Sequence, residues 1–438
     1  MTGREATAGA KRGRGNVSRD APVAEAGQVI GLLNLCARAE CDAAHYDRLA
    51  QQAARFLDWD RLPAEAEVHG LAPLLYTHLR SAGIQPPLDT RRQLQALYLR
   101  HRRANQIRAE ELLRILTAFE ARGIRAIVLK GAAVSHIIYP DPALRPMSDL
   151  DLLVSTSDAL SAQAVLAGLG FRAAPPASGL FLHRHLTIAT AVVKGLPVQV
   201  EIHHRLLSDY FDNLIALVGN RWSVGVKTGD RHPSAAEALM DRAQPFALGD
   251  ITAFALGHED MLAHLCQHLR SHVNVWDFPR LIWVADVVSY AERFAAEIDW
   301  VDVGHDAPGI IRLLSLLHHI TPLSEECLSR AGIEPGKVPP GLGVDFQGWP
   351  RVRRGEWRQR GVRWMLHETL FPSEWWLRLR YNLGSTRTIL LARWVRHPLH
   401  ILAQVVRALL EHLGWPSALE LAGQRARVDS RAGETHGA

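Results

Sequence analysis

The sequence predicts an α/β core between two helical regions, and two observations support this fold class. Within residues 123–154, the apolar run Ile127-Val128-Leu129 stops at a Gly-containing turn, and a second strand-like run follows about one helix-length later. Residues 28–121 and 258–294, on either side, carry apolar residues at helical spacing. Strand-like runs that alternate with helical segments are typical of α/β domains.

The N-terminal part of the chain divides into a tail and a helical region. Residues 1–26 contain Gly, Ala and charged residues without periodicity, and we expect a disordered tail there. Residues 27–122 are predicted to be helical. The last and longest of these helices has apolar residues at helical spacing: Leu112, Leu113, Ile115, Leu116 and Phe119. Gly123 is a suitable residue to end it.

The predicted core spans residues 123–206. Strands are expected at 124–130, 149–154, 171–174, 186–193 and 197–203, with helices at 131–138 and 158–169. Ser155, Thr156 and Ser157 precede the second helix and are suited to cap its N-terminus.

Four further segments follow the core. The Pro-rich, polar stretch 207–255 is interpreted as a connector, and residues 256–345 as a helical region broken near Pro279. Residues 346–423 form an Arg/Trp-rich segment that we interpret as a helical cap. Residues 424–438 are expected to be a second disordered tail.

Acidic residues on two of the predicted strands point to a metal site. Asp149 and Asp151 flank Leu150, and successive side chains of a strand alternate between faces, so the two acids share one face. Their repulsion costs stability unless a cation lies between them. Glu201 lies on the polar face of the strand 197–203, where Val198, Val200 and Ile202 alternate with polar residues. It is positioned to reach the same metal.

The pattern Gly131…Asp149-x-Asp151…Glu201 resembles the nucleotidyltransferase fold of the DNA polymerase β superfamily. The stretches LKGAAV, YPDPALRPMSDLDLLV and VEIHHRL look most like the bacterial group described as nucleotidyltransferase family proteins. The resemblance covers roughly residues 30–400 and is strongest over 124–206 and 258–290. It implies an α/β nucleotidyltransferase core with a mixed sheet, flanked by helical N-terminal and C-terminal regions.

The resemblance also assigns the three acids their roles. Asp149 and Asp151 would bind two metal ions and Glu201 the catalytic one, so that all three are metal ligands and catalytic residues. Two divalent ions roughly 3.5–4 Å apart clamp the attacking and leaving oxygens of a phosphoryl transfer. An all-oxygen ligand set favours Mg²⁺, with Mn²⁺ as the alternative ion.

Residues around the turn and just before the acids are candidates for nucleotide binding. These are Lys130, Gly131, Ala132, Arg145 and Ser148. The superfamily usually has Gly-Gly or Gly-Ser where this chain has Gly131-Ala132, so Ala132 offers a backbone N–H to a phosphate but no hydroxyl. Lys130 is interpreted as a phosphate contact or as a surface lysine. Arg145 would bind phosphate oxygens or brace the Pro140–Pro146 loop by an ion pair.

Two features of the helical region 256–345 have structural interpretations. His264, His268 and His272 lie four residues apart, a spacing that can bind zinc, but packing or hydrogen bonding is the commoner role of helix histidines. Arg280 and Asp286 are expected to form a structural ion pair.

Residues 348–415 interleave Trp and Arg, a pattern with three interpretations. The segment could stack on bases and contact phosphates of a nucleic acid, or lie on a membrane surface as an amphipathic helix. We favour a packed cap, because Leu390, Leu391, Trp394 and Val395 form a stripe that needs a partner helix.

Composition sets the outer limits. A chain of 438 residues that is 47% hydrophobic can bury substantial cores, and its net charge of +5 is a weak pointer to nucleic acid. Four cysteines without a CxxC spacing favour reduced thiols and a cytoplasmic location. No apolar run reaches the roughly 18 residues of a membrane span, and the N-terminus lacks a signal-peptide pattern.

The predicted function is metal-dependent transfer of a nucleoside monophosphate from an NTP, with ATP the first candidate, and release of pyrophosphate. The acceptor, whether small molecule, peptide, protein or RNA, is left open by the sequence. The alternative is a catalytically weak nucleotide-binding or interaction protein whose basic segment 348–415 contacts nucleic acid or a membrane surface.

Overall fold

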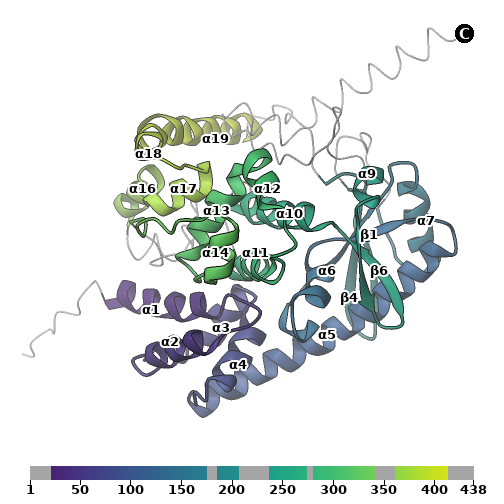
Figure 1. Ribbon diagram of the computed structural model, residues 1–438, viewed down its shortest axis with the longest axis horizontal. Helices are drawn as coiled ribbons and strands as arrows, with labels where there is room; N and C mark the ends of the chain where they lie inside the picture. Colours follow the sequence, from purple (N-terminus) through teal and green to yellow (C-terminus); the bar gives the residue numbers. More distant parts are fainter. Residues whose placement is uncertain (1–20, 175–184, 207–235, 274–279, 341–360, 413–438) are drawn as a thin grey trace, which may run out of the picture.

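The computed structural model describes residues 21–174, 185–206, 236–273, 280–340 and 361–412, and these residues form one mixed β-sheet with helices around it (Figure 1). The architecture confirms the expected α/β fold class. The expected tails fall largely outside the described residues, as does the stretch 207–235 of the expected connector.

The sheet has six strands in the order β3-β4-β2-β1-β6-β5. Its central pairs are β1–β2, which is antiparallel, and β2–β4 and β1–β6, which are parallel. Antiparallel pairing adds β3 and β5 at the two edges. The strands are β1 (Ala126–Val128), β2 (Asp149–Val154), β3 (Ala189–Val193), β4 (Leu196–His203), β5 (Gln244–Leu248) and β6 (Ile251–Ala255).

The hairpin of β5 and β6 lies where the sequence analysis placed a connector. Residues 244–255 instead extend the sheet beyond β1, with Val128 paired to Ala255. Pro245 is compatible with this edge position, and Phe254 stays 47% exposed, so the hairpin shows little of the apolar pattern of a buried strand. Gly249 and Asp250 form the turn, and were the signal that could have identified the hairpin.

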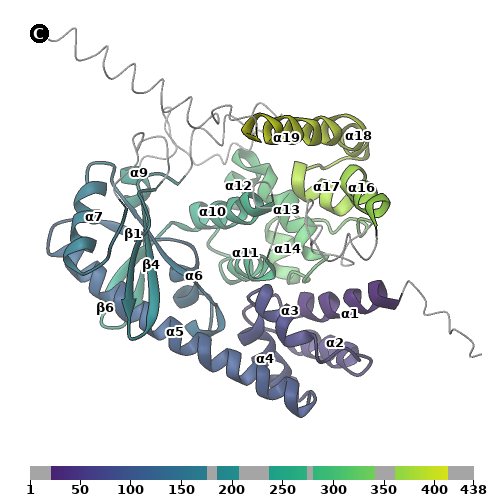
Figure 2. The ribbon, with the colours of Figure 1, turned by 180° about the vertical axis from the view of Figure 1, so that it is seen from behind.

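Helices cover both faces of the sheet. The 33-residue helix α5 (Leu88–Glu120) and α7 (Ala159–Gly168) pack against the face on which Val198, Val200 and Ile202 are fully buried. The other face, which carries the acids, is covered by α6 (Lys130–Ile137), and α10 (His258–Ser271) packs on α6. The face of the sheet that carries the acids is therefore turned toward a layer of helices. Figures 1 and 2 show this layer beside the sheet from opposite sides.

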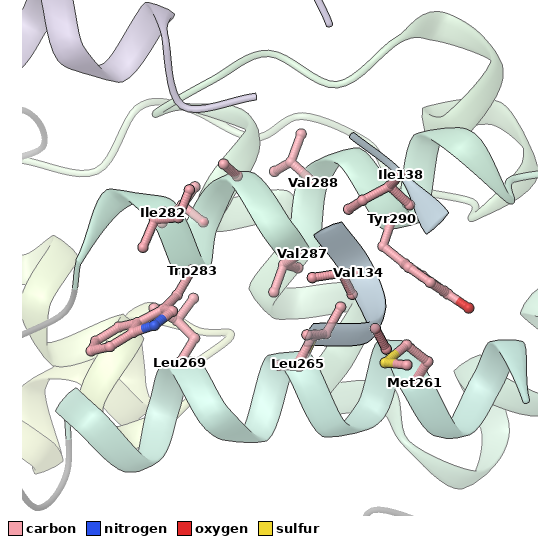
Figure 3. Packing of buried hydrophobic residues seen from close by; sticks show 14 of the residues in the cluster. Val134, Ile138, Met261, Leu265, Leu269, Ile282, Trp283, Val287, Val288 and Tyr290 are labelled. Carbon is pink, nitrogen blue, oxygen red and sulfur yellow. The ribbon is translucent and has the colours of Figure 1, made fainter. Parts of the chain in front are cut away.

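Apolar packing fixes α6, and with it the turn that begins the site. Figure 3 shows Val134 of α6 and Ile138, the residue that follows it, packed among side chains of α10 and of α11 (Leu281–Arg293). The residues labelled on α10 and α11 include Met261, Leu265, Leu269, Ile282, Val287 and Tyr290. All of these are at most 2% exposed, so α6 has little freedom to shift.

The N-terminal helices join this helical layer. They are α1 (Ala21–Leu35), α2 (Ala43–Ala53), α3 (Leu62–Val68) and α4 (Ala72–Ser81). The amide of Ala39 donates to Ser289 Oγ (2.8 Å) and the amide of Ile282 to the carbonyl of His69 (3.1 Å), so both contacts reach α11. Helix α1 begins at Ala21, inside the range expected to be a disordered tail.

Further helices complete the region after the sheet. They are α9 (Ala236–Met240), α12 (Trp300–Asp306), α13 (Pro308–His318), α14 (Glu325–Arg330), α16 (Val362–Leu370), α17 (Glu374–Tyr381), α18 (Thr386–Leu391), a π-helix (Ala392–Arg396) and α19 (His397–His412). Helix α13 packs against α10 and α11 and also against α17, and α16 packs on α19.

The Arg/Trp-rich segment behaves as a cap only in part. Trp375 and Trp376 of α17 are buried, as a packed cap requires. The stripe of Leu390, Leu391, Trp394 and Val395 is instead between 47% and 63% exposed, and no partner helix covers it among the described residues. The exposed apolar surface continues along α19 through Leu399, Leu402, Val405, Val406 and Leu409. Of the described helices, none is both long and apolar enough to cross a bilayer.

Candidate active site

Two parallel strands bring the three predicted acids to one face of the sheet. In the register of β2 and β4, Asp151 lies beside Glu201 and Asp149 lies two residues earlier on the same face. Leu150 and Leu152 point to the opposite face and are at most 1% exposed. The alternation of acidic and apolar residues along the strand thus places the acids on one face of the sheet and the core residues on the other.

His203 joins these acids, although the sequence analysis gave it no role. Its Nε2 lies 2.8 Å from Asp151 Oδ1 and 3.4 Å from Glu201 Oε2. Ligand atoms of Asp151, Glu201 and His203 all lie within 4.8 Å of one another, so that these three residues can hold a metal ion. Asp149 is not one of the three. The position of His203 on the polar face of the strand was the sequence signal that could have identified it.

Lys130 lies at the beginning of α6 and is buried beside the acids. Its Nζ donates a 2.7 Å hydrogen bond to Asp151 Oδ1. The backbone of Lys130 has φ 46°, a left-handed conformation that costs a non-glycine residue about 1–2 kcal/mol. The strained turn points the ammonium group into the site, so Lys130 is not the surface lysine of the alternative interpretation.

The three carboxylates have different proton affinities because their neighbours differ. Burial raises the pKa of Asp149, and the negative charges of Asp151 and Glu201 raise it further against the opposing effect of Lys130. Burial also acts on Asp151, but Lys130 and the hydrogen bond from His203 bring its pKa well below the usual value. Burial raises the pKa of Glu201, but the hydrogen bond with His203 and the positive charge of Lys130 together lower it below its usual value.

This donor set fits a divalent cation. Two ionised carboxylates and an imidazole lie close together, and the repulsion that raises the pKa of Asp149 would be relieved by a positive ion. Imidazole is a better ligand for Mn²⁺ and later transition metals than for Mg²⁺, so His203 makes Mn²⁺ a stronger alternative than the acids alone suggest.

Arg145, a predicted phosphate ligand, forms a buried ion pair with Asp286 of α11. Its Nη2 lies 2.6 Å from Asp286 Oδ2, and its Nε lies 3.2 Å from both carboxylate oxygens. The hydroxyl of Tyr139 donates to Asp286 Oδ1 (2.8 Å). The structure thus shows the bracing ion pair that was the other interpretation of Arg145. It also corrects the expected partner of Asp286, which is Arg145 and not Arg280.

Gly131 is required by this ion pair. A Cβ atom at Gly131 would lie 2.7 Å from Arg145 Cζ and still closer to Nη1. The guanidinium cannot move away easily, because it also donates to the carbonyl of Pro146 (2.9 Å). The glycine of the predicted phosphate-binding turn therefore has a packing role that holds α6 against the loop before β2.

The other predicted nucleotide-binding residues lie at different depths. Ala132 is 2% exposed within α6. Ser148 is exposed, and its Oγ donates to Asp149 Oδ1 (3.2 Å). Of these residues, Ser148 is the one on the surface, next to an acid of the site.

His268 of α10 and His272, the residue that follows this helix, pack on an aromatic ring beside the site. The ring of His272 stacks on Trp283 with centroids 3.9 Å apart, and the ring of His268 meets Trp283 edge-on at 5.2 Å. Burial and the nearby positive charge of Lys130 lower the pKa of His268 well below its usual value. The surroundings of His268 in the helical layer thus favour its neutral form.

The mixed sheet, with acids on adjacent parallel strands and a Lys-Gly turn before them, is of the nucleotidyltransferase kind. Comparison with known families agrees: the family described as "Uncharacterised nucleotidyltransferase" matches residues 56–328. This match covers more than half of the chain, and the protein belongs to that family. No significant match to a curated protein or to a solved structure is found. Membership in this family supports a role in nucleotidyl transfer.

Proposed function

We propose that this protein transfers a nucleoside monophosphate from an NTP to an acceptor, with a divalent metal bound by the acids, and releases pyrophosphate. The observation that carries the proposal is the convergence of Asp151, Glu201 and His203 from two parallel strands, with Asp149 on the same face. ATP is the first candidate for the NTP, and Mg²⁺ or Mn²⁺ for the ion.

The residues of the site have separate parts in this reaction. An acceptor oxygen attacks the α-phosphorus, the bond from that phosphorus to the bridging oxygen breaks, and the electron pair leaves with pyrophosphate. Glu201 accepts the proton of the acceptor, while His203 and Lys130 keep Asp151 ionised and oriented. A metal held by Asp151, Glu201 and His203, with Asp149 as a further donor on the same face, would supply positive charge that stabilises the transferring group.

The experiment that tests the proposal measures pyrophosphate release. The protein is incubated with each α-labelled NTP, Mg²⁺ or Mn²⁺, and a cell extract as the source of acceptor. We expect release and a labelled product from at least one NTP. Asp151→Asn should lower the rate at least about 1,000-fold, equivalent to roughly 4 kcal/mol of lost transition-state stabilisation. Asp250→Asn, at the exposed turn between β5 and β6, is the matched control and should keep full activity.

Two outcomes would contradict the proposal. Undiminished release by a folded Asp151→Asn protein would exclude the acids as the catalytic centre. Nucleotide binding without release for every NTP would favour the alternative of a nucleotide-binding protein on the same fold.

The exposed apolar face of α18 and α19 favours a second function, contact with an anionic membrane surface. The large apolar side chains exposed on these helices are aliphatic apart from Trp394, which suits an acyl layer better than the bases of a nucleic acid. Residues 386–412 contain four arginines and a single glutamate, so the same helices are attracted to anionic headgroups. We propose that α18 and α19 lie on such a membrane, parallel to its surface.

A further inference from the structure

Arg108 of α5 is a buried guanidinium without a counter-ion. Its residue is 7% exposed, its Nε has no hydrogen-bond partner, and no ion pair to it is found within the described residues. An arginine stays protonated at any physiological pH, so this charge cannot be removed by titration. A buried, unpaired charge is unfavourable unless a ligand compensates it.

The face of α5 that carries Arg108 is turned toward the loop that leads into β2. One helical turn earlier, Asn105 donates to the carbonyls of Pro142 and Arg145, both at 2.8 Å, in the loop that leads into β2. Residues three apart on a helix share a face, so Arg108 points toward the beginning of the same strand. There burial lowers the pKa of Arg108 and the Asp149 carboxylate raises it, although no ion pair joins the two groups.

A second arginine approaches Asp149 from the helical layer. Arg280 precedes α11, its Nε donates to the carbonyl of Val68 (3.0 Å), and its guanidinium lies 5.9 Å from the ring centroid of Trp283. Burial and the neighbouring Arg145 lower its pKa, while Glu67, Asp149 and Asp286 raise it. Helices on opposite faces of the sheet thus each supply an arginine near Asp149.

We propose that Arg108 and Arg280 form the subsite that binds the β- and γ-phosphates of the NTP. This inference rests on the proposed nucleotidyl transfer and names which residues take the leaving group. Arg145 was the predicted phosphate ligand, but its donors are used by Asp286 and Pro146. Arg108 has free donors, and a guanidinium matches the paired oxygens of a phosphate.

The subsite has a defined effect on the reaction. As the bond between the α-phosphorus and the bridging oxygen breaks, negative charge accumulates on the departing pyrophosphate. The buried guanidinium of Arg108 and the partly exposed one of Arg280, which Val68 holds in place, would stabilise that charge. The phosphates, in turn, neutralise the buried charge of Arg108.

Binding of inorganic tripolyphosphate to the full-length protein tests this subsite directly. The titration is followed calorimetrically in EDTA, with Arg108→Met, Arg108→Lys and the control Arg122→Met, whose side chain is exposed at the end of α5. We expect the Kd to rise at least tenfold in Arg108→Met, to rise less in Arg108→Lys, and to stay unchanged in Arg122→Met. An unchanged Kd in Arg108→Met would overturn the proposal.

A thermal melt without ligand separates binding from a structural role. If Arg108 is held for a ligand, Arg108→Met should melt at the same temperature as the wild type or higher, because it removes an uncompensated buried charge. A lower melting temperature with tripolyphosphate affinity intact would assign Arg108 a structural role and overturn the subsite.

The subsite and the proposed function can fail separately. Tripolyphosphate has no nucleoside and undergoes no transfer, so Arg108-dependent binding without any pyrophosphate release would leave the subsite standing while the proposed function fails. Conversely, pyrophosphate release by Arg108→Met with unchanged KM and kcat would remove the subsite and leave the function intact.

Discussion

The site on β2 and β4 and the surface of α18 and α19 depart from the usual distribution of polar and apolar residues in opposite directions. The site buries charge: Asp151 is 2% exposed and Arg108 is 7% exposed. The helices expose apolar side chains, such as Leu391 at 60%. Charged residues are rarely fully buried, and large exposed apolar patches are uncommon in monomeric proteins. The comparison teaches that both regions carry an arrangement that is unfavourable in the isolated protein, and that the ions and the membrane surface of the two proposals would offset it.

The largest effect on stability is expected where a buried charge already has its partner. Asp286→Asn leaves the guanidinium of Arg145 buried without an anion, which typically lowers the free energy of unfolding by about 3–5 kcal/mol. Urea denaturation measures the change, and Asp250→Asn serves as the exposed control. A loss below about 1 kcal/mol would show that water reaches the pair, and would weaken the contrast between a buried site and an exposed helix surface.

Substitution of exposed leucines of α19 should weaken membrane binding and leave the stability of the fold unchanged. Leu399→Ser combined with Leu402→Ser removes apolar area worth at least ~1.5 kcal/mol per leucine, so we expect binding to vesicles with anionic lipid to fall roughly 100-fold. Co-sedimentation measures this, and the melting temperature should stay unchanged. Leu57→Ser, at an 85% exposed position far away in sequence, is the control. Equal binding by the double variant and the wild type would contradict the membrane proposal.

Substitution of Gly131 should cost less than loss of the buried charge. Gly131→Ala places a methyl group against the fixed guanidinium of Arg145, and such overpacking typically costs about 1–3 kcal/mol. Gly168→Ala in α7 is a matched control, because no atom within 4 Å would meet its new methyl group. Alanine is also the better helix former there, so the control should be neutral or slightly stabilising. Equal unfolding free energies for the two variants would show that Arg145 moves aside freely.

The sequence predicted what local alternation determines and missed what depends on distant packing. Strand periodicity was enough to place Asp149, Asp151 and Glu201 on polar faces. The partner of Arg145 is 141 residues away on α11, and no local pattern identifies it. The depth of Arg108 likewise depends on how α5 packs against the loop before β2. For α18 and α19, the sequence showed an apolar stripe but not whether another helix covers it.

The smallest expected effect is on stability, and it has opposite signs for substitutions of Asp149 and Asp151, two acids of the same strand. In the metal-free protein, the folded-state pKa of Asp149 is raised, so Asp149 contributes most to stability at low pH and this contribution is lost as pH rises through its folded pKa. Asp149→Asn should therefore stabilise the protein at pH 8, with a gain that shrinks toward pH 4. The pKa of Asp151 is depressed, so Asp151→Asn removes a favourable charge and should destabilise the protein at pH 8. Melting temperatures in EDTA across this pH range measure both changes. The same sign for both variants would show that repulsion between the acids, and not the pairing of Asp151 with Lys130 and His203, controls the stability of the site without metal.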